Sequence, residues 1–251
     1  MVKLTNKEYD ALDGLRSTDV RRILENPYGY KINKKLSNRA SLDIGSYAHA
    51  ILLEPNTIDK DFTIYEKGKG STEAVKAIRE LGLTPISKDD AINIENAISA
   101  LKKTEAYSLF NNCKFEMSFI KEYQDVMLKC KTDAVNENLI IDFKTTSTQG
   151  GASPSSFIKS CANYGYHIQA AHYIAVTEIQ RFVFVVLELV EPYMVGVYTL
   201  DSVSLDFGLD KVKEAIEIYK NLYKFKNNLY IDTQDYSKIK TLTLPNWVYY
   251  Q

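Results

Sequence analysis

The chain has 251 residues, of which 31 are Lys or Arg and 32 are Asp or Glu, so its formal net charge is -1. Apolar residues make up 45%, aromatic residues 12% and charged residues 25%, which are ordinary globular proportions. These values exclude a disordered chain, a collagen-like repeat and a disulfide scaffold as the main state. The length suits one large domain or two small ones, and the near-zero charge argues against a protein that coats nucleic acid through a global positive field.

The cysteines and apolar runs indicate the compartment. An odd number of cysteines without close spacing favours a reducing, cytoplasmic setting. Three thiols cannot supply the four ligands of an iron–sulfur cluster, so we interpret them as small core residues: Cys113, Cys130 and Cys161. The longest apolar run, 182–187, has the length of a buried strand and is too short to span a bilayer. No signal peptide is visible, and we expect a cytoplasmic protein.

The N-terminal part, about 1–110, is predicted to be mainly helical. Ser17 is a candidate cap for a short helix that Pro27 ends. A second helix is predicted over 41–53, and one of its faces carries Leu42, Gly45, His49, Leu52 and Leu53. After a flexible loop at 67–71, helices are predicted near 72–81 and over 88–103, the latter opened by a Ser87-x-x-Asp90 capping pattern.

Strands dominate the next part of the chain, with predicted ranges of 114–121, 125–135 and 139–146. The middle strand alternates between two faces. One face carries Val126, Leu128, Cys130, Thr132 and Ala134, and the other carries Met127, Lys129, Lys131, Asp133 and Val135. Because the turn at 136–138 is so short, the last two strands must pair as an antiparallel hairpin.

The C-terminal part, 111–225 including those strands, continues with predicted helices over 155–162 and 166–177. Strands are then predicted over 181–189 and 194–200, and an amphipathic helix over about 205–223. The tail, 226–251, has no assigned role. The order of elements indicates an α/β or α+β fold with a mixed sheet, which we treat as a single domain.

Asp142 and Lys144 are the centre of the predicted chemistry. They share one face of an apolar strand, where a charged pair is costly to bury unless it has a function. The hairpin brings Asp133 close to Asp142, and Glu116 lies on the preceding predicted strand. Neighbouring carboxylates favour Mg²⁺ or Mn²⁺, and a lysine beside the ion can orient or deprotonate a water molecule. The alternative is a surface ion pair on an edge strand.

Two helices carry further candidate residues, each with an alternative structural role. His49 lies one turn after Gly45 and is either a core histidine or a metal ligand for which Gly45 leaves room. Tyr166, Gln169 and Tyr173 share one helix face. They are either the side of a half-buried helix or groups that position phosphates and the lysine.

Taken in order, these motifs resemble the RecB-type branch of the PD-(D/E)xK nuclease superfamily. The match comprises Gly45-x-x-x-His49, Glu116, Asp133, Asp142-Phe143-Lys144-Thr145 and Tyr166-x-x-Gln169-x-x-x-Tyr173. The segments 15–27 and 45–55 resemble more narrowly the exodeoxyribonuclease VIII (RecE-like) phage exonucleases. Thr132 stands where the superfamily pattern has the proline before the first Asp.

The resemblance implies an α/β PD-(D/E)xK nuclease core, a central mixed sheet flanked by helices, and a role for each residue. His49, Asp133, Asp142 and the main-chain carbonyl of Phe143 would bind Mg²⁺, with Mn²⁺ as a possible substitute. Lys144 would activate or position water, and Glu116 would orient the lysine or a second ion. Tyr166 and Gln169, with Tyr173 on the same face, would support the lysine and contact the DNA backbone.

The resemblance also implies an activity and partners. The family hydrolyses duplex DNA from an end, 5′ to 3′, and leaves a 3′ single strand for an annealing protein in phage-type recombination. A homo-oligomeric ring in the cytoplasm of a bacterial host is therefore expected. The alternatives are a related endonuclease or structure-specific nuclease and, in another class, a catalytically inactive DNA-binding module.

Positive charge is concentrated between residues 16 and 39, which is a candidate wall for a DNA channel. This stretch has two acidic residues against seven basic ones: Arg16, Arg21, Arg22, Lys31, Lys34, Lys35 and Arg39. A solvated surface is the alternative interpretation. A locally basic groove in a nearly neutral protein suits an enzyme that slides along DNA.

Overall fold

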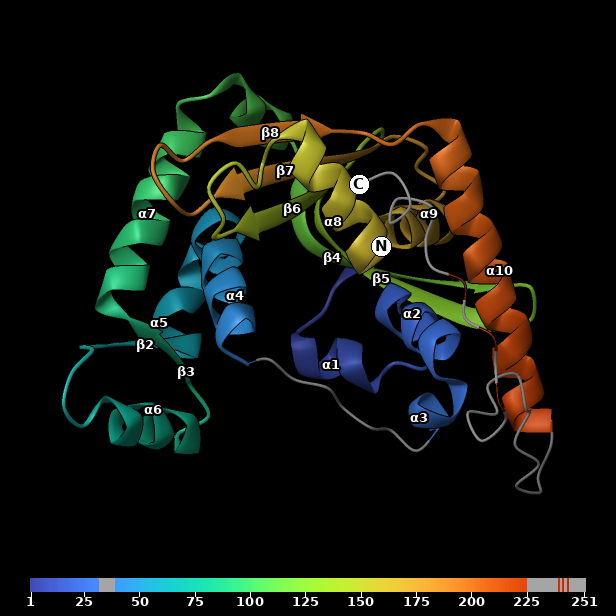
Figure 1. Ribbon diagram of the computed structural model, residues 1–251, viewed down its shortest axis with the longest axis horizontal. Helices are drawn as coiled ribbons and strands as arrows, with labels where there is room; N and C mark the ends of the chain where they lie inside the picture. Colours follow the sequence, from blue (N-terminus) through green and yellow to red (C-terminus); the bar gives the residue numbers. More distant parts are fainter. Residues whose placement is uncertain (32–38, 225–238, 240, 242, 244–251) are drawn as a thin grey trace.

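The fold is α/β, as predicted, with a central mixed sheet of six strands flanked by helices (Figure 1). The computed structural model describes residues 1–31 and 39–224, together with residues 239, 241 and 243. In sheet order the strands are β1 (Val2–Lys3), β4 (Lys114–Tyr123), β5 (Val126–Val135), β6 (Ile140–Thr146), β7 (Phe182–Glu188) and β8 (Val195–Tyr198). β6 and β7 are parallel, and the other neighbours are antiparallel.

Helices cover both faces of the sheet. One face packs against α4 (Arg39–Leu53) and α7 (Lys88–Lys102). The opposite face packs against α2 (Ser17–Glu25), α8 (Pro154–Tyr164), α9 (Tyr166–Thr177) and α10 (Ser202–Lys224). Figure 1 shows α4 and α7 on one side of the molecule and α9 and α10 on the other.

Smaller elements complete the described chain. They are α1 (Asn6–Ala11), α3 (Pro27–Lys31), α5 (Ile58–Asp61), α6 (Ser71–Glu80) and two 3₁₀ turns at Pro55–Thr57 and Glu105–Phe110. β2 (Phe62–Tyr65) and β3 (Thr84–Ser87) form a separate parallel pair beside α6. Neither strand of this pair, nor the short β1, was predicted from the sequence.

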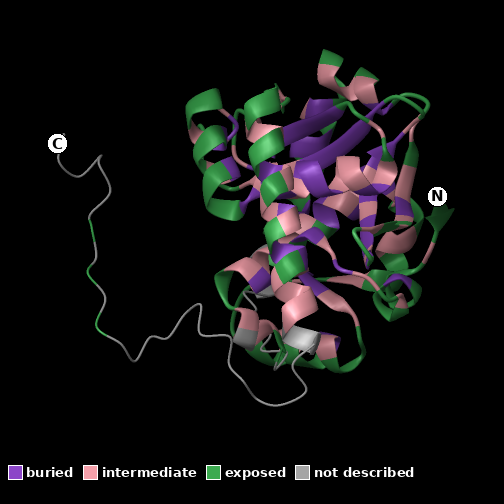
Figure 2. Ribbon diagram, turned by 90° about the vertical axis from the view of Figure 1, so that its right-hand side faces the viewer, coloured by how far each residue is buried: buried purple, intermediate pink, exposed green. Residues whose placement is uncertain are grey.

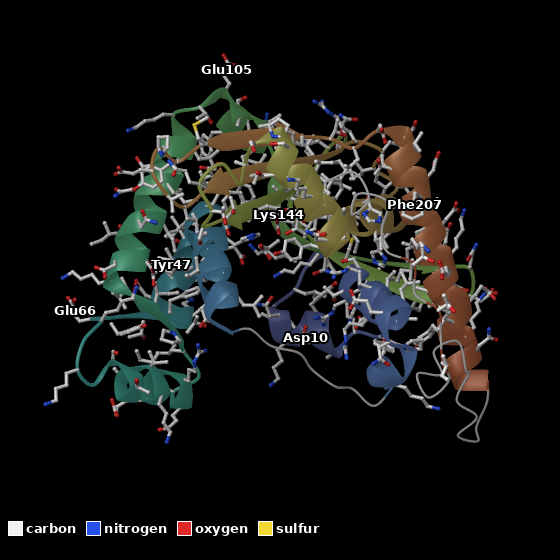
Figure 3. All side chains as sticks on the ribbon, viewed as in Figure 1. Asp10, Tyr47, Glu66, Glu105, Lys144 and Phe207 are labelled. Carbon is white, nitrogen blue, oxygen red and sulfur yellow. The ribbon has the colours of Figure 1, made fainter. Side chains whose placement is uncertain are left out.

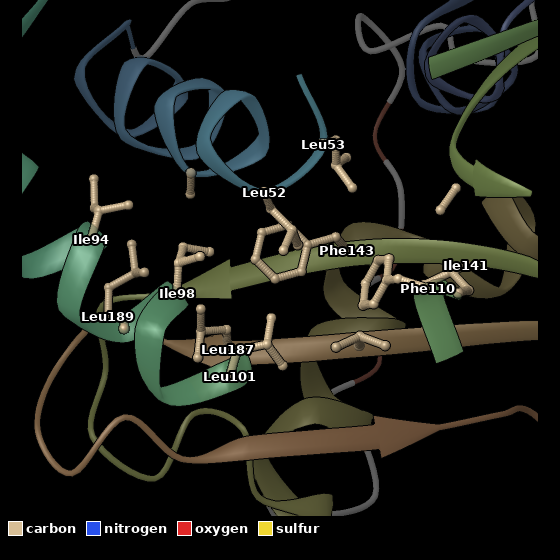
Figure 4. Close-up of a cluster of buried hydrophobic side chains, with 14 of the residues drawn as sticks. Leu52, Leu53, Ile94, Ile98, Leu101, Phe110, Ile141, Phe143, Leu187 and Leu189 are labelled. Atoms are coloured by element: carbon tan, nitrogen blue, oxygen red, sulfur yellow. The ribbon is translucent and has the colours of Figure 1, made fainter. Parts of the chain in front are cut away.

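The core follows from the period of two in β6 and β7. Ile141 and Phe143 point toward α4 and α7, whereas Ile140 and Phe184 point toward α8 and α9. Figure 4 shows Phe143 among the leucine and isoleucine side chains of the first cluster. Figure 2 shows the buried strands enclosed by helices whose outer surfaces are exposed. Both faces of β7 are thus covered, which explains its nearly continuous apolar sequence.

Most predicted elements are confirmed within three residues at each end, including the antiparallel β5–β6 hairpin and the Ser87 cap on α7. Two local predictions are wrong. The N-cap of α2 is Arg16, whose backbone N–H donates to Asp19 at 3.0 Å, so Ser17 is already helical. Leu42 is exposed, because the buried side of α4 runs through Tyr47 and Ala48.

The predicted division at about residue 110 remains a prediction, and the predicted tail lies outside the described residues except at positions 239, 241 and 243. None of the described helices is long and apolar enough to cross a membrane.

Candidate active site

The candidate site lies where β5 and β6 separate. Their pairing covers Ala134 with Ile141 and Val135 with Ile140, after which β6 continues along β7 as far as Thr146. At the point of separation, Oδ2 of Asp133 accepts a hydrogen bond from the backbone N–H of Phe143 at 2.7 Å. A carboxylate therefore takes the place of a main-chain acceptor, and it satisfies a donor that the separation would leave unpaired.

Three potential metal ligands meet on the α4 side of this opening. His49 Nδ1 lies 3.5 Å from Asp133 Oδ1. One ligand atom from each of His49, Glu116 and Asp133 lies within 4.8 Å of the other two. All three side chains are partly exposed, so an ion could reach them. The sequence predicted all three residues for the site, but it placed Glu116 beside the metal rather than with the ligands.

The backbone of Glu116 is unusual for a strand residue. Its φ is 56°, in the left-handed region, although Phe115 and Met117 on either side pair regularly with β5. That register places Glu116 opposite Asp133. A non-glycine residue in this conformation carries strain of roughly 1–3 kcal/mol, which persists only where the surroundings hold it. Here the side chain is held by Lys131, whose Nζ lies 2.7 Å from Glu116 Oε2.

Asp142 and Lys144 form an ion pair on the α9 side of the sheet, with Nζ 2.5 Å from Oδ2. Gln169 joins both groups, because its Nε2 donates to Asp142 Oδ1 at 2.7 Å and its Oε1 accepts from Lys144 Nζ at 3.1 Å. Nζ also lies 4.6 Å from the centre of the Tyr166 ring. Asp142 is almost fully buried, and Lys144 lies near the middle of the view in Figure 3.

Burial and charge shift the pKa of each group. Burial raises the pKa of Asp142 to about 6 and also raises that of Glu116, which is further raised by the nearby Asp133. Burial would lower the pKa of Lys144 and His49, but Asp142 and Asp133 respectively hold them above their ordinary values. Burial alone would raise the pKa of Asp133. The attraction of the neighbouring His49 outweighs this effect and holds the pKa below its ordinary value.

Cavities open on both sides of this centre. One of about 470 Å³ is lined by the three potential ligands, together with Gly45, Asn6 and Lys131 among others. A second of about 340 Å³ is lined by Lys131, Lys144, Tyr166, Gln169, Tyr173 and Arg21 among others. The packing around Gly45 would also accept a Cβ atom, because a Cβ there would lie 3.9 Å from its nearest neighbour, Thr145 Oγ1.

Three further residues that were predicted to contact DNA or support the site have other partners. The Tyr173 hydroxyl donates to the carbonyl oxygen of Lys131 at 3.0 Å, so it supports β5. Arg21 lines the second cavity and pairs with Glu25 at 3.0 Å. Arg22 lies outside the lining of that cavity, with its guanidinium over the ring of Tyr30 at 5.2 Å. Of the predicted basic stretch, Lys34 and Lys35 and the side chain of Arg39 lie outside the described residues.

Lys131 is a site residue that the sequence argument did not select. The sequence did contain a signal for it, because Lys131 and Asp133 are two positions apart and therefore share one face of the predicted strand. Its partner could not be anticipated, since the left-handed backbone of Glu116 leaves no trace in the composition of β4.

The donor set fits a divalent metal ion. The two carboxylates supply the oxygen ligands that hard cations prefer, and the imidazole adds a nitrogen ligand of the kind that transition-metal ions accept. Asp142 lies outside the group formed by His49, Glu116 and Asp133. Its buried Oδ2 nevertheless has no hydrogen bond of proper geometry within the described chain, despite its closeness to Lys144. This Asp142 oxygen is therefore a further potential ligand for an ion bound between β5 and β6.

A mixed sheet that carries an acid–lysine pair beside an imidazole and two carboxylates defines a protein of the PDDEXK-like class. The family model described as "PDDEXK-like domain of unknown function (DUF3799)" matches residues 27–228, and the chain belongs to this family. Membership supports a nuclease function and the use of a divalent metal. No curated protein sequence matches the chain.

Solved structures give a fold comparison. A "Putative exonuclease" from Eubacterium rectale is similar with a TM-score of 0.62 at 13% identity, over 98% of this chain and 97% of that one. A phage related exonuclease from Haemophilus somnus 129PT matches with a TM-score of 0.39 at 14% identity, over 86% of this chain and 98% of that one. At such identities the first comparison shows the shared fold, and the second carries no argument.

Proposed function

We propose that the protein is a Mg²⁺-dependent exonuclease that degrades duplex DNA from an end, 5′ to 3′, and leaves a 3′ single strand. One observation carries the proposal. The Asp142–Lys144 pair, joined by Gln169, lies one strand away from the His49, Asp133 and Glu116 group. A positioned lysine next to a cation site is what hydrolysis of a phosphodiester requires.

Each side chain has a distinct task in this scheme. His49, Asp133 and Glu116 would hold the ion, and Asp142 with the Phe143 carbonyl would complete its surroundings. Once bound, the ion supplies charge that stabilises the phosphate in the transition state. Lys144 holds or moves a proton of the attacking water at Nζ, and Gln169 keeps that atom in place from one side while Tyr166 covers it from another.

The exonuclease direction and the partners are supported by sequence resemblance. The fold is also shared with the Eubacterium rectale protein whose name includes exonuclease. We propose DNA ends as substrate, a homo-oligomeric ring, a single-strand annealing protein as partner, a role in phage-type recombination, and the cytoplasm of a bacterial host as location. Base sequence should matter little, because an enzyme that moves along DNA must contact the backbone.

The test compares linear duplex DNA with covalently closed circles of the same sequence. With Mg²⁺ we expect nucleotide release from the linear DNA alone, and we expect none in excess chelator. Release from closed circles would favour the endonuclease, and binding without release would favour the inactive DNA-binding module. Full activity in chelator would contradict the metal assignment.

Lys144→Ala isolates the chemistry. We expect release to fall by about 10²- to 10⁴-fold, the usual contribution of a positioned proton-transfer group. The matched control is Lys121→Ala, which removes a lysine paired with Glu178 at 2.9 Å on the remote end of β4 and should leave the rate unchanged. Thermal melting of both variants checks the fold. Equal activity in Lys144→Ala and the parent would overturn the mechanism.

A further inference from the structure

Lys131 stands between the two cavities and has no task in the scheme above. Its Nζ lies 2.7 Å from Glu116 Oε2 and 3.0 Å from Asn6 Oδ1. The side chains of Lys131 and Glu116 are only 15% and 16% exposed, so their charges meet largely out of water. The Tyr173 hydroxyl fixes the backbone of Lys131 from the opposite side of β5. Lys131 is thus a firmly placed charge at the edge of the metal ligands.

The charges of the centre limit how many ions it can hold. Asp133, Asp142 and Glu116 contribute three negative charges, and Lys131 and Lys144 contribute two positive ones. With the imidazole neutral, as a ligand must be, the centre has a net charge of -1 before any ion binds. One divalent ion brings the centre to +1, whereas a second would leave +3 in a half-buried site.

The geometry leads to the same limit. In two-metal sites the ions lie about 3.5–4 Å apart and share carboxylates. A second ion here would need a further oxygen of Glu116 or Asp142, beyond the one that each would contribute to the first ion. Each of these carboxylates already has an ammonium group within ion-pair distance, Lys131 on one and Lys144 on the other. Lys144 is needed to position the attacking water. Lys131 is therefore the ammonium group whose place a second ion could take.

We propose that Lys131 is a positioning residue that occupies the place of a second divalent ion, so that the centre binds one ion per chain. Its ammonium group keeps Glu116 in its strained conformation and turned toward His49 and Asp133. The inference rests on the proposed function in one respect, namely that these residues form a metal site.

The experiment counts Mn²⁺ ions per chain in the full-length protein without DNA, by titration calorimetry and electron paramagnetic resonance. We expect one ion in the parent and in Lys131→Arg, which keeps the charge. Lys131→Met should bind two, and the second should produce the spin-coupled spectrum of a close pair. Lys121→Met is the matched control, because it removes the same charge from an ion pair elsewhere and should still bind one.

Each other result has a clear meaning. Two ions in the parent, or one ion in Lys131→Met, would overturn the proposal, and weaker duplex binding in the latter case would instead make Lys131 a phosphate contact. If Lys131→Met does not fold, Lys131→Gln is measured, since it also removes the charge but keeps a polar side chain. The count needs no DNA cleavage, so it stands even if the protein proves not to be a nuclease. A parent that binds no Mn²⁺ overturns both proposals.

Discussion

Gln169 shows how a neutral side chain can organise two charges. Its amide donates to Asp142 and accepts from Lys144, so it matches both partners without adding charge between them. A glutamate at this position would repel Asp142, and a lysine would repel Lys144. The helical spacing that linked Tyr166, Gln169 and Tyr173 in the sequence identified a common face. It did not separate the two residues that contact Lys144 from Tyr173, which supports β5.

The buried environment of His172 affects how the stability of the protein depends on pH. It is fully buried, and its Nε2 lies 3.1 Å from the carbonyl oxygen of Lys129. Nδ1 has no hydrogen-bond partner among the described residues. Burial lowers the pKa of this imidazole to about 4, because a charged ring would lose its hydration. The folded protein therefore contains a neutral histidine where the unfolded chain would bind a proton.

This difference makes stability depend on pH in a stated direction. Between pH 6.5 and 4 the unfolded chain binds more protons at His172, so the free energy of unfolding falls as the pH falls. From pH 7 to pH 5 the loss is about 2 kcal/mol, from a shift to about 4. Urea unfolding of the parent and His172→Gln at both pH values measures it, since the other groups contribute equally. Parallel losses in both proteins would refute the assignment.

At the scale of elements, the packing of α9 against α10 depends on Gly208. A Cβ at this position would collide with the carbonyl oxygen of His167, so the two helices approach as closely as their backbones allow. The contact continues through the buried Val212, Ala215 and Ile216 of α10. Since α9 carries Gln169, the position of this helix also sets the position of Lys144.

Gly208→Ala should therefore destabilise the fold, although alanine is the better helix former. Forcing a methyl group into a filled contact costs roughly 1–3 kcal/mol, which exceeds the helix propensity gain of about 1 kcal/mol. Urea unfolding measures the change. Asp206→Ala, an exposed substitution on the same helix, is the control and should leave stability nearly unchanged. A more stable Gly208→Ala protein would show that the helices can separate without cost.

The pattern of apolar residues predicted the elements well because β7, buried on both sides, is a continuous apolar run and one side of each long helix is buried. It did not predict β2 and β3, two four-residue strands that lie apart from the central sheet, and β3 contains a proline, which is disfavoured within strands. The site was predicted as a set of residues, including His49, Asp133 and Lys144. Its division into a ligand group and an acid–lysine pair was not, because it depends on where β5 leaves β6.

At the scale of the whole molecule, the near-neutral charge conceals a local arrangement. Of the basic residues predicted for a channel wall, Arg16 and Arg21 line the second cavity beside Lys129, Lys131 and Lys144. Much of this charge is already paired within the chain, as between Arg21 and Glu25. A groove of paired charges can exchange partners with a phosphate backbone without holding it tightly.

The proposed ring makes a prediction at this scale. A chain of 28.6 kDa should run in solution as a closed oligomer with a mass that is a whole multiple of this value. Light scattering coupled to size exclusion measures the mass, at several protein concentrations and with and without Mg²⁺. A protein that remains a monomer at all of them would remove the ring from the proposal and leave the chemistry of the site untouched.

The separation of β5 from β6 has one more consequence. A sheet normally has two edges, both at the surface, where unpaired backbone groups invite pairing with other chains. This sheet has a third edge inside the molecule, along the part of β6 that follows Ile141. In this part of β6, Phe143 packs against the buried residues of α4. The fold thus keeps these backbone groups away from the outer edges of the sheet and beside the candidate metal ligand Asp133.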